Sequence, residues 1–308
     1  MKLLVVGTLA FDSVETPFGQ AENVLGGSAS YLATSASFFT QPQIVGIVGQ
    51  DFPQEHLDFF VQRGIDCAGV QKTDGKTFRW TGSYHGNMNE AKTHDTQLNV
   101  LESFRPDLPE NYKNTPYVFL GNIDPDLQMH VINQLTDAKL IACDTMNFWI
   151  EGNRPSLLKT FEKVDLLSIN DAEAKLLSGE ENLVAAARAI RQMGPKYVVI
   201  KRGEYGAILF TEESMFAAPA IPLEVVKDPT GAGDTFAGGM IGYLAHIDRI
   251  DQQSLRQALI MGNAMASFTV QDFSLNALKK VTLPNIQSRF DEYIDLMHFT
   301  PQIDLPAS

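Results

Sequence analysis

Short apolar runs alternate with segments of helical periodicity along most of this chain. The apolar runs are continuous, as strands buried on both faces of a sheet require. This alternation predicts an α/β fold with a mostly parallel central sheet and helices on both of its faces. Strands are expected at residues 3–8, 44–48, 117–120, 140–143, 166–169 and 197–200. Helices are expected at residues 28–39, 52–62, 127–135, 171–177, 183–193, 233–245 and 254–270.

Two polar segments interrupt this alternation. Residues 12–25 and, roughly, 72–100 carry apolar side chains at alternating positions, among them Phe78, Trp80 and Tyr84. Such a pattern is typical of antiparallel strands that are exposed on one side. Because these segments are too small for a core of their own, we expect a lid over a ligand site within one domain spanning residues 1–308. A hairpin that only packs on the main sheet is the alternative.

Charge and cysteine content limit the partners and the compartment. The 308 residues carry a net charge of −13, which argues against nucleic acid or an acidic membrane as partner. Cys67 and Cys143 lack CxxC spacing, so a cysteine metal cluster is excluded and a reducing compartment fits. Residues 3–11 are short for a signal peptide and Asp12 follows at once. No apolar run approaches the ~18 residues of a membrane span, so we expect a cytoplasmic protein.

The most informative segment is Asp-Pro-Thr-Gly-Ala-Gly-Asp at residues 228–234, which leads directly into a predicted helix. Gly231 and Gly233, on either side of Ala232, allow the backbone to approach a ligand closely. The N–H groups at the helix start would point at that ligand, and the helix dipole favours negative charge there. Asp234 adds a carboxylate that can take up a proton. The segment therefore predicts chemistry on a phosphate or another oxyanion.

Two common glycine motifs fit this turn less well. A Walker-type P-loop requires GxxxxGK[ST], and no Gly-Lys-Ser/Thr occurs in the chain. A dinucleotide fingerprint requires a third glycine where Phe236 stands, and a βαβ unit where two helices follow one another. A turn that merely tightens a strand–helix connection, with Asp234 as a dipole partner, is the purely structural alternative.

Together with four further motifs, this turn resembles the ribokinase-like (PfkB) carbohydrate and nucleoside kinases. Gly26-Gly27 before a small-residue helix, Val-Gly-Ile-Val-Gly-Gln-Asp at 45–51, Asn-Asp-Ala-Glu at 170–173 and Lys-Arg-Gly-Glu-Tyr-Gly-Ala at 201–207 resemble the other family motifs. They occur in the family's order, and the match covers essentially the whole chain. The resemblance implies a ribokinase-like three-layer α/β/α fold with a small β lid.

The resemblance also implies an ATP- and Mg²⁺-dependent kinase. Asp234 would accept the proton of the attacking hydroxyl, because positioning and electrostatic stabilisation carry most of phosphoryl transfer. Two of the site residues that the resemblance implies also allow a purely structural role. Asn263 could only hydrogen-bond a neighbouring loop, and Glu173 could only be a solvated carboxylate at a helix start. The implied roles are N–H donors to the transferred phosphoryl at Gly231, Ala232 and Gly233; contacts to nucleotide phosphates and hydrated Mg²⁺ at Asn170 and Glu173; nucleotide contacts at Lys201, Gly203, Gly206 and Asn263; and a monovalent cation, K⁺, at Asp228 and Thr230.

The acceptor pocket departs from the family pattern. Asp12 follows the first strand, where the family usually places a carboxylate that binds substrate hydroxyls with charge-assisted hydrogen bonds. Tyr31 stands where sugar kinases frequently carry Asn, with plain helix packing as its alternative role. Many sugar kinases of the family carry Asp-x-Asn-x-Arg where this chain has Asp-Thr-Met-Asn-Phe-Trp at 144–149. The missing arginine argues against a phosphorylated or acidic sugar. Gly26 and Gly27 would flank the acceptor, and Asn122 and Asn147 would line it from the carboxyl edge of the sheet.

The leading hypothesis is a kinase that phosphorylates a hydroxymethyl group of a neutral sugar or sugar-like molecule. The alternative is a nucleoside kinase of the adenosine type, which the lid aromatics and Tyr31 keep open. A catalytically silent regulator that binds nucleotide or sugar is a further alternative, and a dinucleotide-dependent reductase is remote. The expected partners are ATP and a small-molecule acceptor, and a homodimer through the lid is compatible with the pattern.

Overall fold

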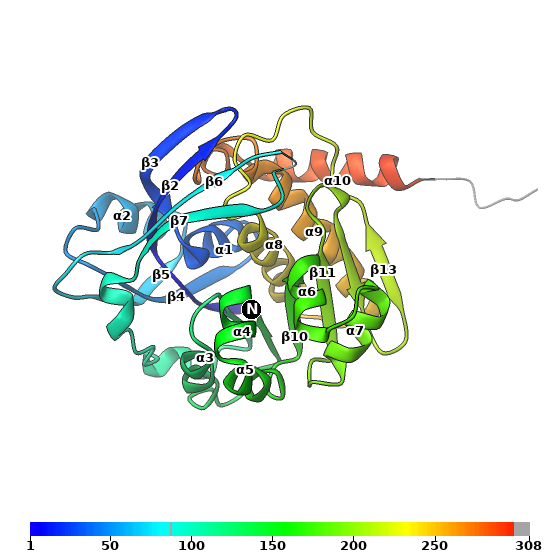
Figure 1. The fold of residues 1–308 in the computed structure, drawn as a ribbon, viewed down its shortest axis with the longest axis horizontal. Helices are drawn as coiled ribbons and strands as arrows, with labels where there is room; N and C mark the ends of the chain where they lie inside the picture. Colours follow the sequence, from blue (N-terminus) through cyan, green and yellow to red (C-terminus); the bar gives the residue numbers. More distant parts are fainter. Residues whose placement is uncertain (87, 299–308) are drawn as a thin grey trace, which may run out of the picture.

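The computed structural model describes residues 1–86 and 88–298, in which nine strands form the central sheet (Figure 1). Seven neighbouring strands run parallel, and the last two pairings at one edge are antiparallel. The strands are β1 (Lys2–Val6), β4 (Gln41–Val48), β5 (Asp66–Lys72), β8 (Tyr117–Leu120), β9 (Leu140–Cys143), β10 (Leu166–Asn170), β11 (Tyr197–Lys201), β12 (Ala207–Phe210) and β13 (Met215–Ala218), in the order β13-β12-β11-β10-β9-β8-β1-β4-β5. The mostly parallel sheet and the six predicted strands are confirmed. β5, β12 and β13 were not predicted.

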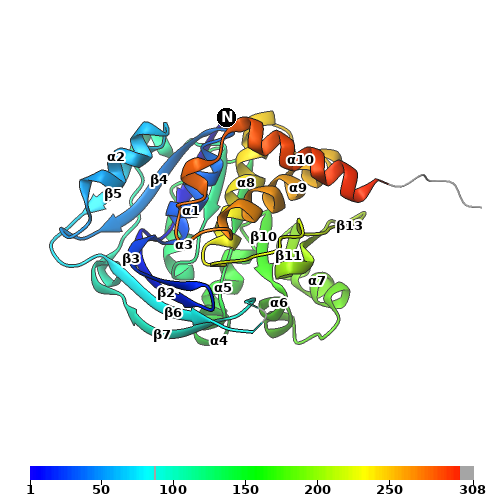
Figure 2. The ribbon, with the colours of Figure 1, turned by 90° about the horizontal axis from the view of Figure 1, so that it is seen from above.

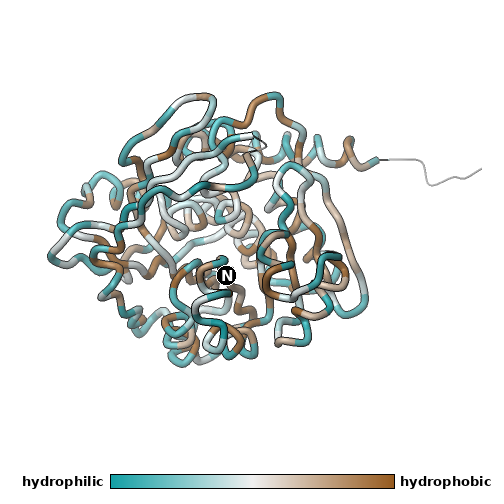
Figure 3. Tube along the Cα trace, viewed as in Figure 1, coloured by the Kyte–Doolittle hydropathy of each residue, from teal (hydrophilic) through white to brown (hydrophobic). Residues whose placement is uncertain are grey.

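Helices cover both faces of this sheet (Figure 2). Leu3 and Val5 of β1 pack in one core cluster, and Leu4 and Val6 pack in the other, because successive side chains of a strand point to opposite faces. Figure 3 shows the apolar positions of the central strands as brown segments inside the molecule. One face holds α1 (Ser28–Ala36), α2 (Gln54–Gln62), α8 (Ala232–Ile247), α9 (Gln252–Thr269) and α10 (Leu283–Met297), and the other holds α3 (Pro125–Ile132), α4 (Asn147–Gly152), α5 (Arg154–Phe161), α6 (Asp171–Ser178) and α7 (Leu183–Arg191).

Small residues allow α8 to pack closely against α1. A Cβ built on Gly238 would lie 2.2 Å from the carbonyl oxygen of Leu32, and one on Gly242 would lie 2.9 Å from Cα of Ala36. The hydroxyl of Ser35 donates to the carbonyl of Thr235 at 2.7 Å. Gly238 and Gly242 therefore let α8 pack closely along the middle and the end of α1. None of the helices in the described ranges has both the length and the apolarity needed to cross a bilayer.

A second sheet of four strands forms the lid. Its strands are β2 (Ala10–Thr16), β3 (Gly19–Gly26), β6 (Phe78–Tyr84) and β7 (Ala91–Gln97), in the order β3-β2-β6-β7. β2 pairs with β3, and β6 with β7, in the antiparallel sense that the sequence predicts. β2 and β6, however, run parallel. The reason is that β2 continues from β1 and β6 from β5, two strands that leave the central sheet in the same direction.

Candidate active site

The turn that precedes α8 has a backbone conformation that favours glycine. Gly231 has φ 73° and forms the N-cap of α8, which no side chain caps. A Cβ built on Gly231 would lie 2.4 Å from the ring of Tyr31, and one on Gly233 would lie 3.0 Å from Nζ of Lys201. The first N–H groups of a helix lack intrahelical acceptors and favour an anion. The turn therefore combines backbone donors with a lysine ammonium.

The three predicted backbone donors differ in their surroundings. The N–H of Ala232 donates to the carbonyl of Pro229 at 3.1 Å, so it already has an acceptor within the turn. The carbonyl of Gly231 accepts from the N–H of Thr235 at 2.8 Å, which closes the first helical turn. Gly233, in that first turn and beside Lys201, fits an incoming anion better than Ala232 does.

Asp234 lies in the first turn of α8. The residue is half-buried. Desolvation of the carboxylate raises the pKa of Asp234 to about 6; the charge of Lys201 lowers this pKa in part, and Glu173 raises it further. A carboxylate with this pKa is ionised at neutral pH and close enough to that pH to exchange a proton efficiently.

Three carboxyl groups surround Lys201 at the carboxyl ends of the central strands. Asp144 follows β9, and Lys201 ends β11. Glu173 and Asp234 lie in the first turns of α6 and α8. Burial raises the pKa of Asp144 well above its ordinary value, as does Asp234, and Lys201 offsets this in part. Oδ1 of Asp144 is buried with no hydrogen-bond partner among the described residues. No site role was predicted for Asp144; its place directly after a buried strand was the available signal.

Asn170 and Glu173 form a reciprocal cap at the start of α6. Oδ1 of Asn170 accepts from the N–H of Glu173 at 2.8 Å, and Oε2 of Glu173 accepts from the N–H of Asn170 at 2.8 Å. Burial raises the pKa of Glu173, and Lys201 lowers it in part. The cap holds the Glu173 carboxylate at the carboxyl edge of the sheet, where it can accept from water on a hydrated cation. Within the described residues no three candidate ligands are grouped tightly enough to hold a metal ion directly.

Asp12 lies on the lid strand β2 and contacts the predicted Gly-Gly pair. A Cβ built on Gly26 would lie 1.9 Å from its carboxylate, so any larger residue at position 26 would displace it. Gly27 has φ 89°, and a Cβ there would lie 2.5 Å from the carbonyl oxygen of Thr8. Desolvation raises the pKa of Asp12 to about 7, and the backbone amide of Gly27 lowers it in part. The two glycines therefore hold a buried carboxylate at the start of α1.

The strand register places aromatic side chains on the same lid face as Asp12. Asp12 pairs with Trp80 across the β2–β6 ladder, and Tyr84 lies four residues further along β6. Directly paired residues project from the same face of a sheet. A Cβ built on Gly82 would lie 2.3 Å from the Trp80 ring, so this indole lies flat along its own strand. Its Nε1 donates to Oγ1 of Thr93 at 3.1 Å, which holds the ring over Gly82.

Asn122 and Asn147 lie at the carboxyl edge of the sheet but are not equivalent. Oδ1 of Asn122 accepts from Nε1 of Trp149 at 3.0 Å, so this amide orients an aromatic side chain of α4. Its Nδ2 lies 3.0 Å from the sulfur of Met146. Asn147 is exposed at the first residue of α4, where Phe148 is also 63% exposed. The sequence pattern indicated the two amides but not the apolar residues that accompany them.

The predicted nucleotide residues gather around the loop after β11. Gly203 has φ 53° and Gly206 φ 83°, and the N–H of Arg202 donates to the carbonyl of Gly206 at 2.7 Å. A Cβ built on Gly203 would lie 2.1 Å from Oδ1 of Asn89, which belongs to the turn of the lid hairpin. The lid thus contacts the nucleotide loop. Nδ2 of Asn263 donates to the carbonyls of residues 218 and 219 at 3.3 and 3.2 Å, as in the loop-bonding alternative.

Asp228 anchors the loop that leads into the glycine turn. It is 1% exposed and accepts from the N–H of Thr230 at 2.9 Å and from the N–H of Ser274 at 3.4 Å. Desolvation raises its pKa, and the hydrogen bonds from Thr230 lower it in part. A monovalent cation at Asp228 and Thr230 stays a prediction.

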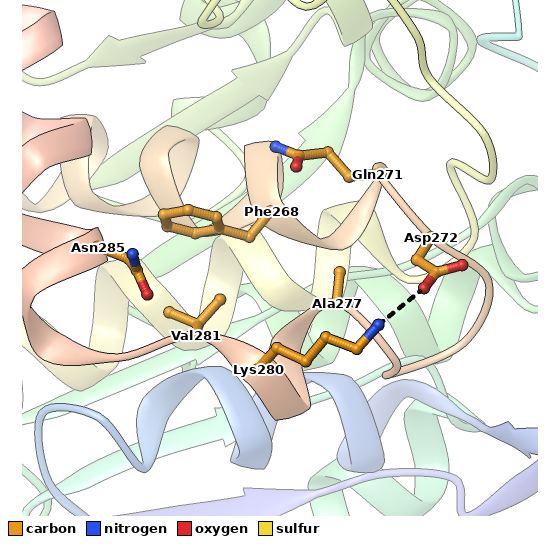
Figure 4. Close-up of a pocket in the computed structure, with 7 residues that line it drawn as sticks. All are labelled: Phe268, Gln271, Asp272, Ala277, Lys280, Val281 and Asn285. Atoms are coloured by element: carbon orange, nitrogen blue, oxygen red, sulfur yellow. Dashed lines mark ion pairs between the residues drawn. The ribbon is translucent and has the colours of Figure 1, made fainter.

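A cavity of about 340 Å³ between α9 and α10 shares no residue with this cluster (Figure 4). Lys280 and Asp272, which both line it, form an ion pair with 3.5 Å between Nζ and Oδ2. No predicted site residue lines it, so it does not bear on the chemistry. Its lining residues are Phe268, Gln271, Asp272, Ala277, Lys280, Val281 and Asn285.

Comparison with known proteins agrees with this geometry. The profile of the pfkB family of carbohydrate kinases matches residues 5–280. The cytidine kinase of Thermococcus kodakarensis is 31% identical over 253 residues, which are 79% of this chain and 88% of that protein. The nucleoside kinase of Methanothermobacter thermautotrophicus is 27% identical over 297 residues, 88% of this chain and 89% of that protein. The structure of the Methanocaldococcus jannaschii nucleoside kinase has the same fold, with a TM-score of 0.75, 18% identity and coverage of 94% and 98% of the two chains.

These matches confirm the predicted family, fold class and type of enzyme. Kinases of this family transfer a phosphoryl group from ATP to hydroxyl groups of sugars or nucleosides. A solved structure of similar fold, from E. coli, contains ATP and Mg²⁺ together. The carboxylates around Lys201 and the glycine turn fit these two cofactors. The chain belongs to the pfkB family of carbohydrate kinases and is an ATP-dependent phosphotransferase with an alcohol group as acceptor.

Proposed function

We propose that this enzyme is a nucleoside kinase that transfers the γ-phosphoryl group of ATP to the hydroxymethyl group of a ribonucleoside. This was the alternative, not the leading hypothesis, of the sequence analysis. The two curated relatives above are a cytidine kinase and a nucleoside kinase, which favours it over a kinase of free neutral sugars. The observation that carries the proposal is the strand register, which puts Trp80, with its indole lying along β6, on the same face of the lid as Asp12.

A carboxylate beside an aromatic plane suits a ribose that carries a base. Asp12 can accept hydrogen bonds from sugar hydroxyls, and a neutral base can stack on the indole, which is worth about 1–3 kcal/mol per base in other nucleic-acid binders. The acceptor side holds Asp12, Asp228 and Asp234, and this negative charge disfavours a phosphorylated acceptor. The neighbouring lid cation, Arg79, is paired with Asp51 at 2.9 Å.

In the proposed mechanism, Asp234 accepts the proton of the acceptor hydroxyl. The hydroxyl oxygen forms a bond to the γ-phosphorus while the bond from that phosphorus to the leaving oxygen of ADP breaks. Gly233 and the ammonium of Lys201 are neighbours, and the N–H of Gly233 and this ammonium stabilise charge on the transferred group. Bound Mg²⁺ neutralises phosphate charge, and Asp144 and Glu173 would hold it through water, because hard cations prefer oxygen ligands.

A coupled assay of ADP release tests the proposal. Cytidine, uridine, adenosine and inosine are compared with ribose and fructose under the same conditions. We expect nucleosides to have the higher kcat/KM, and an enzyme that turns over only free sugars would contradict the proposal. Asp234→Asn should lower kcat by roughly 10²–10⁴-fold, the range for a general base. Asp137→Asn, at an exposed position in the turn before β9, is the control and should keep full activity.

Two further expectations belong to the same proposal. A homodimer through the lid is testable by sedimentation; all seven residues of β7 are exposed, and their polar sequence AKTHDTQ favours a hydrated face over an apolar interface. Dependence on K⁺ is testable by exchanging K⁺ for a bulky organic cation in the assay. A cytoplasmic location follows only from the sequence reasoning and stays a prediction.

A further inference from the structure

Tyr31 connects the acceptor helix to the glycine turn. It lies in the first turn of α1, and its N–H lies 3.4 Å from the carbonyl of Gly27, to which it donates. The side chain is 1% exposed. Its ring covers Gly231 so closely that a Cβ there would lie 2.4 to 2.5 Å from Cγ, Cδ1 and Cδ2. The ring therefore packs on the backbone that is proposed to hold the phosphoryl group, and its hydroxyl extends beyond that contact.

The hydroxyl of Tyr31 is a buried polar group without a hydrogen-bond partner among the described residues. Buried donors are nearly always paired, so an unpaired one points to a partner outside the chain. Burial raises the pKa of Tyr31 well above its ordinary value, and Asp12, Asp228 and Tyr84 raise it further. At neutral pH the phenol is therefore protonated and can donate one hydrogen bond that the chain itself does not accept.

The groups around this hydroxyl are those of the acceptor pocket. Asp12 projects from the lid face that also carries Trp80, and Asp234 is the proposed base. Tyr84, on the lid strand β6, also lies close enough to act on the Tyr31 hydroxyl. An ionised carboxylate only accepts hydrogen bonds, whereas a phenol also donates one. A sugar with two neighbouring hydroxyls needs both kinds of partner, because each of its hydroxyls is a donor and an acceptor.

We propose that Tyr31 determines specificity for the ring hydroxyls of the acceptor, its O–H donating to one secondary hydroxyl of the ribose while Asp12 accepts from a hydroxyl of the same sugar. This rests on the nucleoside kinase proposed above and adds that the enzyme selects ribonucleosides over their deoxy analogues. Phenylalanine keeps the ring that packs on Gly231 and lacks only the donor. Tyr31→Phe therefore separates recognition from packing.

The test is a cycle of two enzymes and three acceptors. Wild type and Tyr31→Phe are assayed with cytidine, 2′-deoxycytidine and 3′-deoxycytidine at saturating ATP and Mg²⁺. We expect the substitution to lower kcat/KM for cytidine by about tenfold, mainly through KM, the size of one ordinary hydrogen bond. For the analogue that lacks the recognised hydroxyl, the two enzymes should differ by less than about twofold, because both partners of the bond are then missing.

Tyr112→Phe is the matched control. Tyr112 is also fully buried, but its hydroxyl donates to the carbonyl of Asp66 at 3.3 Å, away from the proposed site. It should not change the ratio of kcat/KM between cytidine and either analogue. The melting temperature of Tyr31→Phe without ligand should equal or exceed that of wild type, since the lost hydroxyl has no partner in the chain.

Equal losses of kcat/KM for all three acceptors, or no loss for any, would overturn the proposal. If wild type phosphorylates no nucleoside, the proposed function fails instead. Wild type and Tyr31→Phe are then compared on the sugar that the enzyme accepts and on its deoxy analogues. The ratios of kcat/KM between the two enzymes test the role of Tyr31 in the same way. The two failures are therefore distinguishable.

Discussion

Replacing Gly231 by alanine tests whether the glycine turn is required by its contact with Tyr31. Gly179, at the end of α6, offers a matched control, because both glycines have φ 73°. A Cβ on Gly231 would lie 2.4 Å from the Tyr31 ring, whereas a Cβ on Gly179 would meet nothing within 4 Å. Gly179→Ala thus measures the cost of the backbone conformation alone. Gly231→Ala adds the steric overlap.

The expected magnitudes follow from these two terms. A left-handed conformation costs an L residue about 1–2 kcal/mol, which is the whole effect expected for Gly179→Ala. Overpacking a buried contact costs about 1–3 kcal/mol more, so Gly231→Ala should lose about 2–5 kcal/mol of unfolding free energy. At roughly 2–4 °C per kcal/mol, the two melting temperatures should differ by several degrees. A shift of about 1 Å in the anion-binding turn should also lower kcat/KM by roughly 10²-fold.

Thermal unfolding and steady-state kinetics of both variants provide the measurement. Gly179→Ala should keep wild-type kcat/KM within about twofold, since its glycine contacts neither the turn nor Lys201. Equal losses of stability and activity in the two variants would refute the reasoning. They would show that the ring of Tyr31 moves away freely and that only the backbone conformation matters.

Three further predictions concern pH and the lid. Because desolvation raises the pKa of Asp234 to about 6, kcat/KM should fall about tenfold per pH unit below pH 6; a profile flat down to pH 5 would exclude Asp234 as the base. Whereas kcat/KM falls towards low pH, the free energy of unfolding should rise. The pKa of Asp12 is raised from 3.8 to about 7, so this carboxyl binds a proton more readily in the folded than in the unfolded chain. Its contribution to stability therefore grows as the pH falls from 7 towards 4. Asp12→Asn should remove that part of the pH dependence of the melting temperature, and an unchanged dependence would contradict it. Trp80→Ala should raise KM for a nucleoside about tenfold or more without affecting the KM for ATP, and equal effects on both would argue against base stacking.

The sequence determined the main layers of this fold. Continuous apolar runs such as Tyr117–Leu120 and Leu140–Cys143 predict strands, because a strand that is covered on both faces of the sheet needs apolar side chains at every position. β5 was missed because it has no continuous apolar run and only Gly69 in it is buried. β12 and β13 were missed because each has only four residues. The parallel pairing of β2 with β6 depends on where two distant segments leave the main sheet, which local patterns do not encode.

For the site, the sequence determined the glycine turn, Asp234 and the Asn170–Glu173 pair, because each is a local motif whose geometry depends on neighbours a few residues away. Only the tertiary structure decided which other groups contact these motifs. Asp144 joins Glu173 and Lys201 because parallel strands end at one edge, and Tyr31 covers Gly231 because small residues bring α1 and α8 together. These contacts join segments up to 200 positions apart, as in the Ser35–Thr235 bond, and depend on packing that no local spacing specifies.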